Sequence, residues 1–148
     1  MNKQTLKRYY KNARSSLING YVKIDNELYI FNNVSIMNLK EFNQNFIEMP
    51  TYNHTIKKYV DRFKAGKFIP LNYNLIQLIN DKEYLKKHSE YDLGNNFGID
   101  LKILKTCCDL IHATNVSILD LEDAGHPVIY INNIKTGAFG WLLPCRVY

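Results

Sequence analysis

The side chains best suited to metal chemistry stand close together near the C-terminal end of the chain. They are Asp120, Glu122, Asp123 and His126. Residues two apart on a strand point to the same face, so Asp120 and Glu122 could share a divalent cation such as Ca²⁺ or Mg²⁺. The same residues also fit an acidic hairpin end, in which Asp123 and Gly125 form the turn. We favour the turn and expect no metal or other cofactor, because short motifs often match by chance.

Three cysteines could carry thiol chemistry. Cys107 and Cys108 are adjacent in a predicted helix, where neighbours cannot form an unstrained disulfide, so we predict that they are small packing residues of the core. Cys145 has no histidine context that would activate it as a nucleophile. The seven glycines form neither a phosphate-binding loop nor a dinucleotide fingerprint. The sequence therefore favours a protein that is not an enzyme.

Positive charge is concentrated at the N-terminus. Residues 1–14 contain Lys3, Lys7, Arg8, Lys11 and Arg14 and no acid, while the rest of the chain has 14 cations and 14 acids, so the net charge of +5 lies in this segment. Four of these cations recur at steps of four, four and three, which places them in one stripe on a helix. Like charges at this spacing weaken a helix. A phosphate-bearing partner is one interpretation of the stripe, and a solvated helix face is the other.

Near its C-terminal end the chain has an apolar run, Trp141-Leu142-Leu143-Pro144. It fits a last strand that packs into the core and is ended by proline. It also fits a hydrophobic groove that receives a peptide. The residues alone leave both interpretations open.

Periodic patterns predict the elements that must position these residues. Apolar side chains at three- and four-residue steps predict an amphipathic helix over residues 2–17. Its buried face consists of Leu6, Tyr9, Tyr10, Ala13 and Leu17. Further helices are expected at 55–65, 75–87 and 100–112, and strands within 21–40 and at 116–121, 127–132 and 138–143. Asp100 is the expected N-cap of the 100–112 helix, whose polar face carries Lys102 and Lys105.

A helix followed by three strands thus occurs twice, in residues 1–40 and in residues 97–148. This repeat predicts an α+β fold with pseudo-two-fold halves, in which two helices pack on one face of a curved antiparallel sheet. We expect one domain over residues 1–148, with residues 41–96 as an insertion or connection. No apolar run approaches the roughly 20 residues that span a bilayer, and no signal-peptide pattern is present. A cytoplasmic protein without a membrane partner is therefore expected.

Several segments of the second half look like those of a known family. Phe97-Gly-Ile-Asp is similar to the entry into the family's last helix, and residues 116–123 and 127–131 are similar to its two penultimate strands. Leu142-Leu-Pro-Cys-Arg-Val is similar to its terminal segment. Over residues 97–147 the chain resembles a single domain of the bacterial DNA sliding clamp, the β subunit of DNA polymerase III. The resemblance implies a DNA-clamp-like fold whose helices contact phosphates without reading bases.

Carried over residue by residue, the resemblance implies two sites. The residues facing double-stranded DNA would be Lys3, Lys7, Lys11, Arg14, Lys102 and Lys105. The peptide-docking residues would be Pro127, Leu142, Leu143, Pro144, Cys145 and Arg146.

The chain departs from the family in size. Clamp subunits have three such domains and close a six-domain ring from two chains, so a ring of this chain would be a homo-oligomer of about six copies. We expect a non-catalytic sliding-clamp-like protein of DNA replication, a processivity factor small enough to be phage-encoded. It would bind DNA nonspecifically, dock replication proteins, or do both. The alternative is a clamp-derived protein–protein interaction module, or a modulator of a host protein, that does not encircle DNA.

Overall fold

The computed structural model describes residues 3–41, 46–69, 71, 74–122 and 124–147. Asp123 of the acidic cluster and the first residue of the predicted 2–17 helix lie outside the described residues. The helices are α1 (Lys3–Asn12), the 3-10 turn η1 (Pro50–Tyr52), α2 (Asn53–Lys64), α3 (Leu75–Ile79), α4 (Lys82–Lys87) and α5 (Leu101–Ile111). The strands are β1 (Gly20–Ile24), β2 (Glu27–Phe31), β3 (Ser35–Asn38), β4 (Ile47–Glu48), β5 (Lys67–Ile69), β6 (Glu90–Gly94), β7 (Phe97–Asp100), β8 (Asn115–Asp120), β9 (Val128–Asn132), β10 (Phe139–Leu142) and β11 (Cys145–Arg146).

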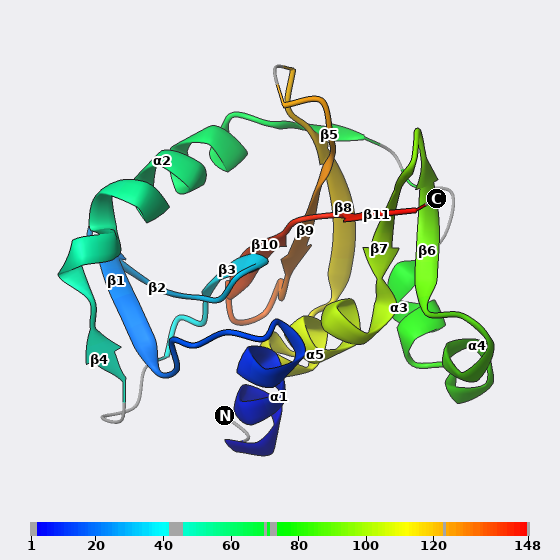
Figure 1. The fold of residues 1–148 in the computed structure, drawn as a ribbon, viewed down its shortest axis with the longest axis horizontal. Coiled ribbons are helices and arrows are strands. Elements are labelled where there is room, and N and C mark those ends of the chain that lie inside the picture. Colours follow the sequence, from blue (N-terminus) through cyan, green and yellow to red (C-terminus); the bar gives the residue numbers. More distant parts are fainter. Residues whose placement is uncertain (1–2, 42–45, 70, 72–73, 123, 148) are drawn as a thin grey trace.

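An eight-stranded sheet in the order β4-β1-β2-β3-β10-β9-β8-β5 forms the centre of the fold (Figure 1). Strands β1 to β3 follow α1, strands β8 to β10 follow α5, and the two sets meet where β3 pairs antiparallel with β10. The order is therefore symmetric about this seam. The α+β class predicted from the sequence is confirmed. The sheet departs from the antiparallel prediction at one edge, where the short β4 runs parallel to β1.

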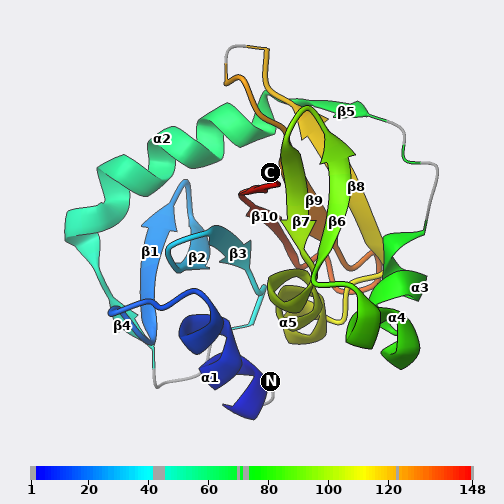
Figure 2. The ribbon, with the colours of Figure 1, turned by 45° about the vertical axis from the view of Figure 1, so that its right-hand side comes forward.

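One face of the sheet is covered by α1 and α5, which lie side by side (Figures 1 and 2). Tyr9 of α1 and Leu104 and Cys107 of α5 belong to one buried cluster with Met37 and Ile131 of the sheet. Fully burying a large apolar side chain contributes about 1.5–3 kcal/mol, so this cluster fixes both helices to the sheet.

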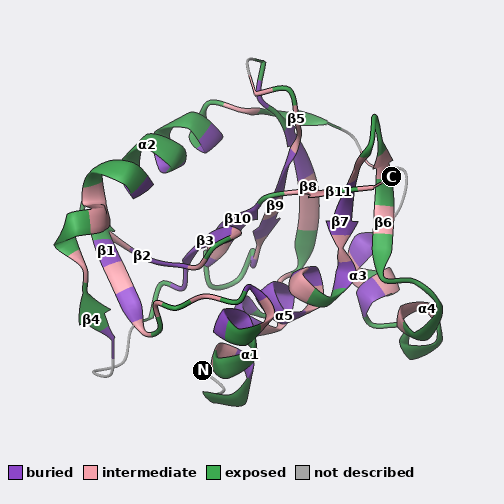
Figure 3. Cartoon of the chain, in the orientation of Figure 1, coloured by how far each residue is buried: buried purple, intermediate pink, exposed green. Residues whose placement is uncertain are grey.

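The opposite face of the sheet is covered by α2, which crosses from the β4 edge toward the β5 edge (Figure 1). Its buried side chains Ile56, Val60 and Phe63 recur at helical spacing and pack in a second cluster with Trp141. Figure 3 shows that the buried side of α2 faces the sheet. Because neighbouring residues on a strand point to opposite faces, the central strands are buried on both sides.

Local turn chemistry fixes the hairpins. Asp25 and Asn26, between β1 and β2, both have positive φ, as do Asn95 and Asn96 between β6 and β7. Two-residue turns with positive φ at both positions match the twist of antiparallel strands, and Asn and Asp tolerate that conformation. At the seam, a Cβ on Gly140 would collide with the Met37 sulfur, so only glycine allows the observed approach of β10 to β3.

The predicted 2–17 helix is too long. Helix α1 ends at Asn12, and Arg14 has φ +50°. The Asn33 amide nitrogen donates to the carbonyl oxygens of Ala13 (2.9 Å) and Arg14 (3.0 Å), which satisfies backbone groups that a longer helix would have used. The chain after Asn12 is thus held by a residue distant in sequence.

The predicted 75–87 helix is two helices. Asn74 caps α3, and Asp81 caps α4 by accepting from the backbone nitrogens of Glu83 (3.0 Å) and Tyr84 (3.2 Å). Asp81 has the extended backbone conformation of an N-cap residue, which interrupts the helical hydrogen bonds and explains the break. The 100–112 helix is α5, and the Asp100 cap predicted for it is confirmed.

A second sheet, in the order β11-β7-β6, follows α4 and receives the end of the described chain (Figure 1). The sequence patterns did not predict β5, β6, β7 or β11. These strands are two to five residues long and mostly exposed or half-buried, and only β6 alternates, with Tyr91 and Leu93 half-buried, so the apolar pattern is too short or too weak to predict them. Among the described residues, no helix is long and apolar enough to cross a membrane.

Candidate functional site

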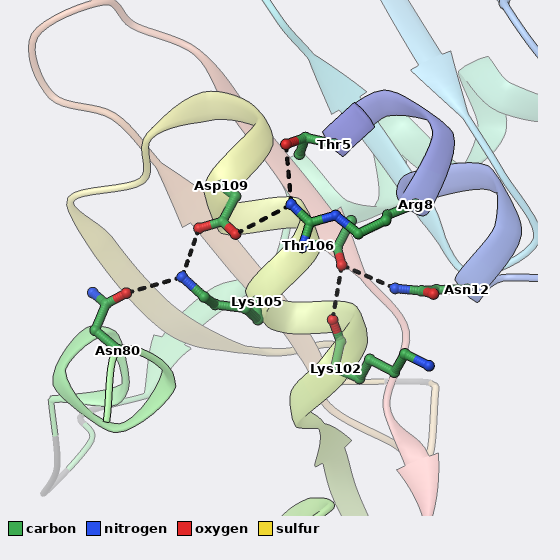
Figure 4. A network of polar contacts seen from close by, with 8 residues as sticks. All are labelled: Thr5, Arg8, Asn12, Asn80, Lys102, Lys105, Thr106 and Asp109. Atoms are coloured by element: carbon green, nitrogen blue, oxygen red, sulfur yellow. Dashed lines mark hydrogen bonds and ion pairs between the residues drawn. The ribbon is translucent and has the colours of Figure 1, made fainter. Parts of the chain in front are cut away.

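Polar contacts join the two helices on the first face of the sheet (Figure 4). The Asp109 carboxylate of α5 accepts from Lys105 Nζ at 2.9 Å and lies 3.8 Å from the Arg8 guanidinium of α1. The Asn12 amide of α1 donates to Thr106 Oγ1 at 2.9 Å. The later residue of α1, Asn12, thus contacts the earlier residue of α5, Thr106, so the two helices pack antiparallel.

The cations predicted to face DNA differ in how they are engaged. Lys3, Lys7 and Lys11 of α1 and Lys102 of α5 are exposed, and none of the four forms an ion pair with another described residue. Lys105 is half-buried, and its ammonium group donates to both Asp109 and Asn80. The structure thus groups four exposed lysines on the helix pair, with a fifth tied into the network between α5 and α3.

Arg14 does not extend the lysine stripe. It lies two residues beyond the end of α1 in a left-handed backbone conformation, so the helical spacing that defined the stripe ends before it. Arg8, which the sequence analysis left out of the DNA-facing set, lies at the junction of α1 and α5 instead (Figure 4). Arg8 and Asn12 are four residues apart and therefore lie on the same side of α1, the side that contacts α5. This spacing is the sequence signal that could have indicated the position of Arg8.

The six predicted peptide-docking residues do not line one groove. Leu142 is 2% exposed and belongs to the core cluster beneath α1 and α5. Its neighbour Leu143 is 42% exposed and points to the α2 side of the sheet, where it lines a hollow. Pro127 lines a different hollow, next to Phe97. Pro144 and Cys145 are half-buried, and Arg146 is exposed with its guanidinium 5.9 Å from the Phe97 ring centre.

The hollow beside Leu143 has a volume of about 130 Å³ and is mostly apolar. Trp141 and Leu143 of the C-terminal segment form one wall, and Tyr59 and Phe63 of α2 form the other. Tyr59 and Leu143 are among the large apolar side chains that remain exposed. This is the feature of the described surface that best matches the predicted docking groove, and α2 supplies the wall that the sequence analysis did not identify.

The acidic cluster is arranged as a hairpin end. Glu122 forms an ion pair with Lys67 at 3.0 Å, and His126 Nδ1 lies 2.9 Å from the Pro127 carbonyl oxygen. Gly125 has φ +69°, as a tight turn requires. No group of three or more His, Cys, Asp and Glu that could hold a metal occurs within the described residues, which exclude Asp123. The metal hypothesis gains no support from this geometry.

The cysteines are placed as packing residues. Cys107 and Cys108 are buried between α5 and the sheet, as predicted. Burial raises the pKa of the Cys107 thiol to about 12 and raises the pKa of Cys108 well above its ordinary value. Cys145 is half-buried in β11, and burial, followed by the nearby Glu90 carboxylate, raises its pKa as well. Raised pKa values keep thiols protonated and poorly nucleophilic at neutral pH.

Both end strands of the eight-stranded sheet expose large apolar side chains. Ile47 of β4 is 64% exposed and Phe68 of β5 is 65% exposed. Unprotected sheet edges with apolar side chains are sites where another chain can add.

Comparison of the chain with protein-family models, with curated proteins and with solved structures finds no match.

Proposed function

We propose that this protein is a non-catalytic DNA-clamp-like protein of DNA replication, which holds duplex DNA through phosphate contacts and docks replication proteins. The observation that carries the proposal is the packing of α1 and α5, in opposite directions, on one face of a sheet whose two halves repeat. The resemblance implies such an arrangement for a clamp-like domain, and this supports the proposal. The resemblance of residues 97–147 to a clamp domain points the same way.

The chemistry of the helix pair suits phosphate rather than base recognition. Lysine side chains with no ion pair among the described residues can displace counterions from DNA, which gives affinity that falls as salt rises. No acid separates Lys3, Lys7 and Lys11, so their field is not cancelled along α1. Asp109, by contrast, neutralises part of the charge of Arg8 and Lys105. The main contribution to DNA affinity should therefore come from α1.

Fluorescence anisotropy with a labelled duplex, measured over a series of salt concentrations, tests this proposal. The double variant Lys7→Glu/Lys11→Glu is expected to weaken binding and to lower the slope of log K against log salt by roughly 1 for each lysine. The matched control is Lys58→Glu/Lys64→Glu, which makes the same charge change at exposed positions of α2 on the opposite face. Equal losses in both variants, or no duplex binding by the unaltered protein, would contradict the proposal.

Whether the protein closes into a ring is tested by its absolute mass in solution, measured by light scattering after gel filtration. A ring of six copies of this 17.4 kDa chain has a mass of about 104 kDa. The exposed apolar edges at β4 and β5 are surfaces through which copies could join. A monomer or dimer at every salt concentration would exclude a free-standing ring.

The second candidate is a protein–protein interaction module, or a modulator of a host protein, that does not encircle DNA. The apolar hollow between α2 and Leu143 favours it, because exposed apolar surface beside a concavity is typical of docking sites. Affinity capture of partners by the unaltered protein and by Leu143→Asp tests this candidate. A partner that is lost with Leu143→Asp and kept with Lys7→Glu/Lys11→Glu, together with weak DNA binding, would favour the module over the clamp.

A further inference from the structure

A cleft of about 450 Å³ lies between the α1–α5 pair and the segment that joins α4 to β6. Arg8 and Asn12 of α1 and Lys102 and Lys105 of α5 line one side of it. The cleft depends on α4, which belongs to the connection between the two halves. Its volume falls in the range of pockets that hold small molecules, about 300–1,000 Å³.

The opposite end of the cleft carries different chemistry. Glu90 of β6 and Asp100 of β7 line it and are direct cross-strand partners. Two carboxylates in this register repel each other. One Asp100 oxygen already accepts from the backbone nitrogens of Lys102 and Ile103, so the second Asp100 oxygen and the Glu90 carboxylate are the acceptors left for a ligand that brings hydrogen-bond donors. The partly buried Leu85 adds apolar lining, above the fully buried Leu101. The cleft therefore has a cationic part, an apolar part and a carboxylate part.

The cations of the cleft retain donors for a ligand. A guanidinium has five N–H donors, and among the described residues Arg8 uses only one of its terminal nitrogens, toward Thr5 and Asp109. Lys105 has three donors and directs two of them to Asn80 and Asp109 (Figure 4). The contacts to Asp109 fix the positions of both cations without using all their donors.

Lys102 adds a third cation to the same side of the cleft. Its ammonium group makes no hydrogen bond to another part of the chain that the structure describes, whereas its carbonyl oxygen accepts from Thr106. Asp100 caps α5, and Lys102 and Lys105 follow it by two and five residues, so they lie about 3 Å and about 7.5 Å further along the helix axis.

We infer that this cleft binds a nucleotide, with its phosphate held by Arg8, Lys102 and Lys105 and its sugar hydroxyls donating to Glu90 and Asp100. Arginine and lysine give charge-assisted hydrogen bonds to phosphate, and acidic side chains accept hydrogen bonds from ribose hydroxyls. The base would pack against the partly exposed Leu85. This site is separate from the exposed lysines of α1 and does not require that the protein bind duplex DNA.

Isothermal titration calorimetry of the full chain with ADP tests the inference, with adenosine and inorganic phosphate as fragments of the ligand. ADP is expected to bind more tightly than either fragment, because only ADP occupies the cationic and apolar parts together. Lys102→Glu is expected to weaken ADP binding at least about tenfold, the typical effect of losing a hydrogen bond to a charged group. Lys58→Glu, an equal charge change on α2, should leave ADP binding unaltered.

A second variant tests the location without changing charge. Leu85→Trp fills the cleft from the α4 side and should abolish ADP binding while leaving the circular dichroism spectrum and duplex DNA binding unaltered. Conversely, Lys7→Glu/Lys11→Glu should reduce duplex binding and leave ADP binding unaltered. Failure of this inference is thereby distinguished from failure of the proposed function.

The nucleotide could be free or could be the end of a nucleic acid strand. A single-stranded oligonucleotide with a 5′-phosphate is compared with the same strand carrying a 5′-hydroxyl, each in competition with ADP. If only the phosphorylated strand competes with ADP, the ligand of the cleft is the 5′ end of a strand. If neither strand competes, the ligand is a free nucleotide. No ADP binding by the folded protein, binding equal to that of inorganic phosphate, or binding that survives Leu85→Trp would overturn the inference.

Discussion

Asn33 in the β2–β3 turn and Asn133 in the β9–β10 turn occupy corresponding places in the two halves of the molecule. The Asn33 amide donates to the carbonyl oxygens of Ala13 and Arg14, just beyond α1. The Asn133 amide donates to the carbonyl oxygens of Ile111 (3.0 Å) and His112 (2.9 Å), at the end of α5. In each half, a turn between strands thus secures the C-terminal end of the helix that precedes the strands.

The halves differ in the surface that their helices present. The exposed lysines of α1 have no acidic partner on the described chain, whereas α5 carries Asp109, which engages Lys105 and Arg8. Only α5 is flanked by α3 and α4, because the connection between the halves packs beside it (Figure 2). The repeated sheet and its turns therefore determine where the two helices lie, while the polar residues of each helix determine what it can bind.

The largest expected effect concerns the packing of the helices. Leu104→Ala in α5 should lower the free energy of unfolding by about 2–5 kcal/mol, because Leu104 is fully buried and its loss leaves a cavity. Leu6→Ala at a half-buried position of α1 should cost less, about 1 kcal/mol. Urea denaturation measures both values. Similar losses at the two positions would show that the two helices are packed equally tightly.

The asparagines at the helix ends give the next largest effect. Asn133→Ala should destabilise the protein by about 1–3 kcal/mol, because it leaves the buried Ile111 carbonyl oxygen without its donor. Asn33→Ala should cost about 0.5–1.5 kcal/mol, since Asn33 is exposed and water can replace its amide. Thermal and urea unfolding of both variants test the order, which would be wrong if Asn33→Ala were the more damaging change.

Burial makes stability depend on pH in the alkaline range. The pKa of Cys107 rises from its ordinary value of 9.0 to about 12, so between these values the folded thiol keeps a proton that the unfolded thiol loses. The unfolded state then binds fewer protons, and stability falls as pH rises, by up to about 1.4 kcal/mol per pH unit for this group. Urea unfolding across this window should show a shallower fall for Cys107→Ala. A fall of equal steepness in the variant would contradict the assignment to Cys107.

The smallest expected effect on stability concerns the contacts between α1 and α5. Asp109→Asn should lower stability by less than about 1 kcal/mol, because the pairs with Arg8 and Lys105 are partly exposed. The same change should strengthen duplex binding, since it removes a negative charge from the helix pair. Anisotropy and denaturation of one preparation test both effects. Weaker duplex binding by a folded Asp109→Asn protein would show that the network positions a cation that DNA needs.

Regular apolar spacing made much of the frame predictable. Helix α5 and its cap at Asp100, the strands β8 to β10 and the α+β class follow from local patterns that the structure confirms. Predictions were wrong where distant residues decide the structure. Asn33 acts in this way on the chain beyond α1. The break between α3 and α4 has a local cause instead, the Asp81 cap, which lies within one apolar pattern. The edge strands β4 and β5 form only because other strands pair with them.

The candidate sites were predictable in part for the same reason. Helical spacing correctly identified Lys3, Lys7 and Lys11 as exposed on one helix, since the spacing is a local property. It could not show that Lys105 binds Asn80 of another element or that Leu142 is buried while Leu143 is exposed. Those outcomes depend on tertiary packing, which supplied the hollow beside α2 and the cleft beside α4.

Two-dimensional NMR of the ¹⁵N-labelled protein, titrated with a short duplex at moderate salt, tests the central claim most directly. The proposal predicts that amide shifts concentrate on α1 around Lys3, Lys7 and Lys11, with a smaller set near Lys102 of α5, and that raising the salt concentration reverses them. Shifts confined to α2 and Leu143, or no shifts in a folded protein, would contradict a clamp-like role for the helix pair.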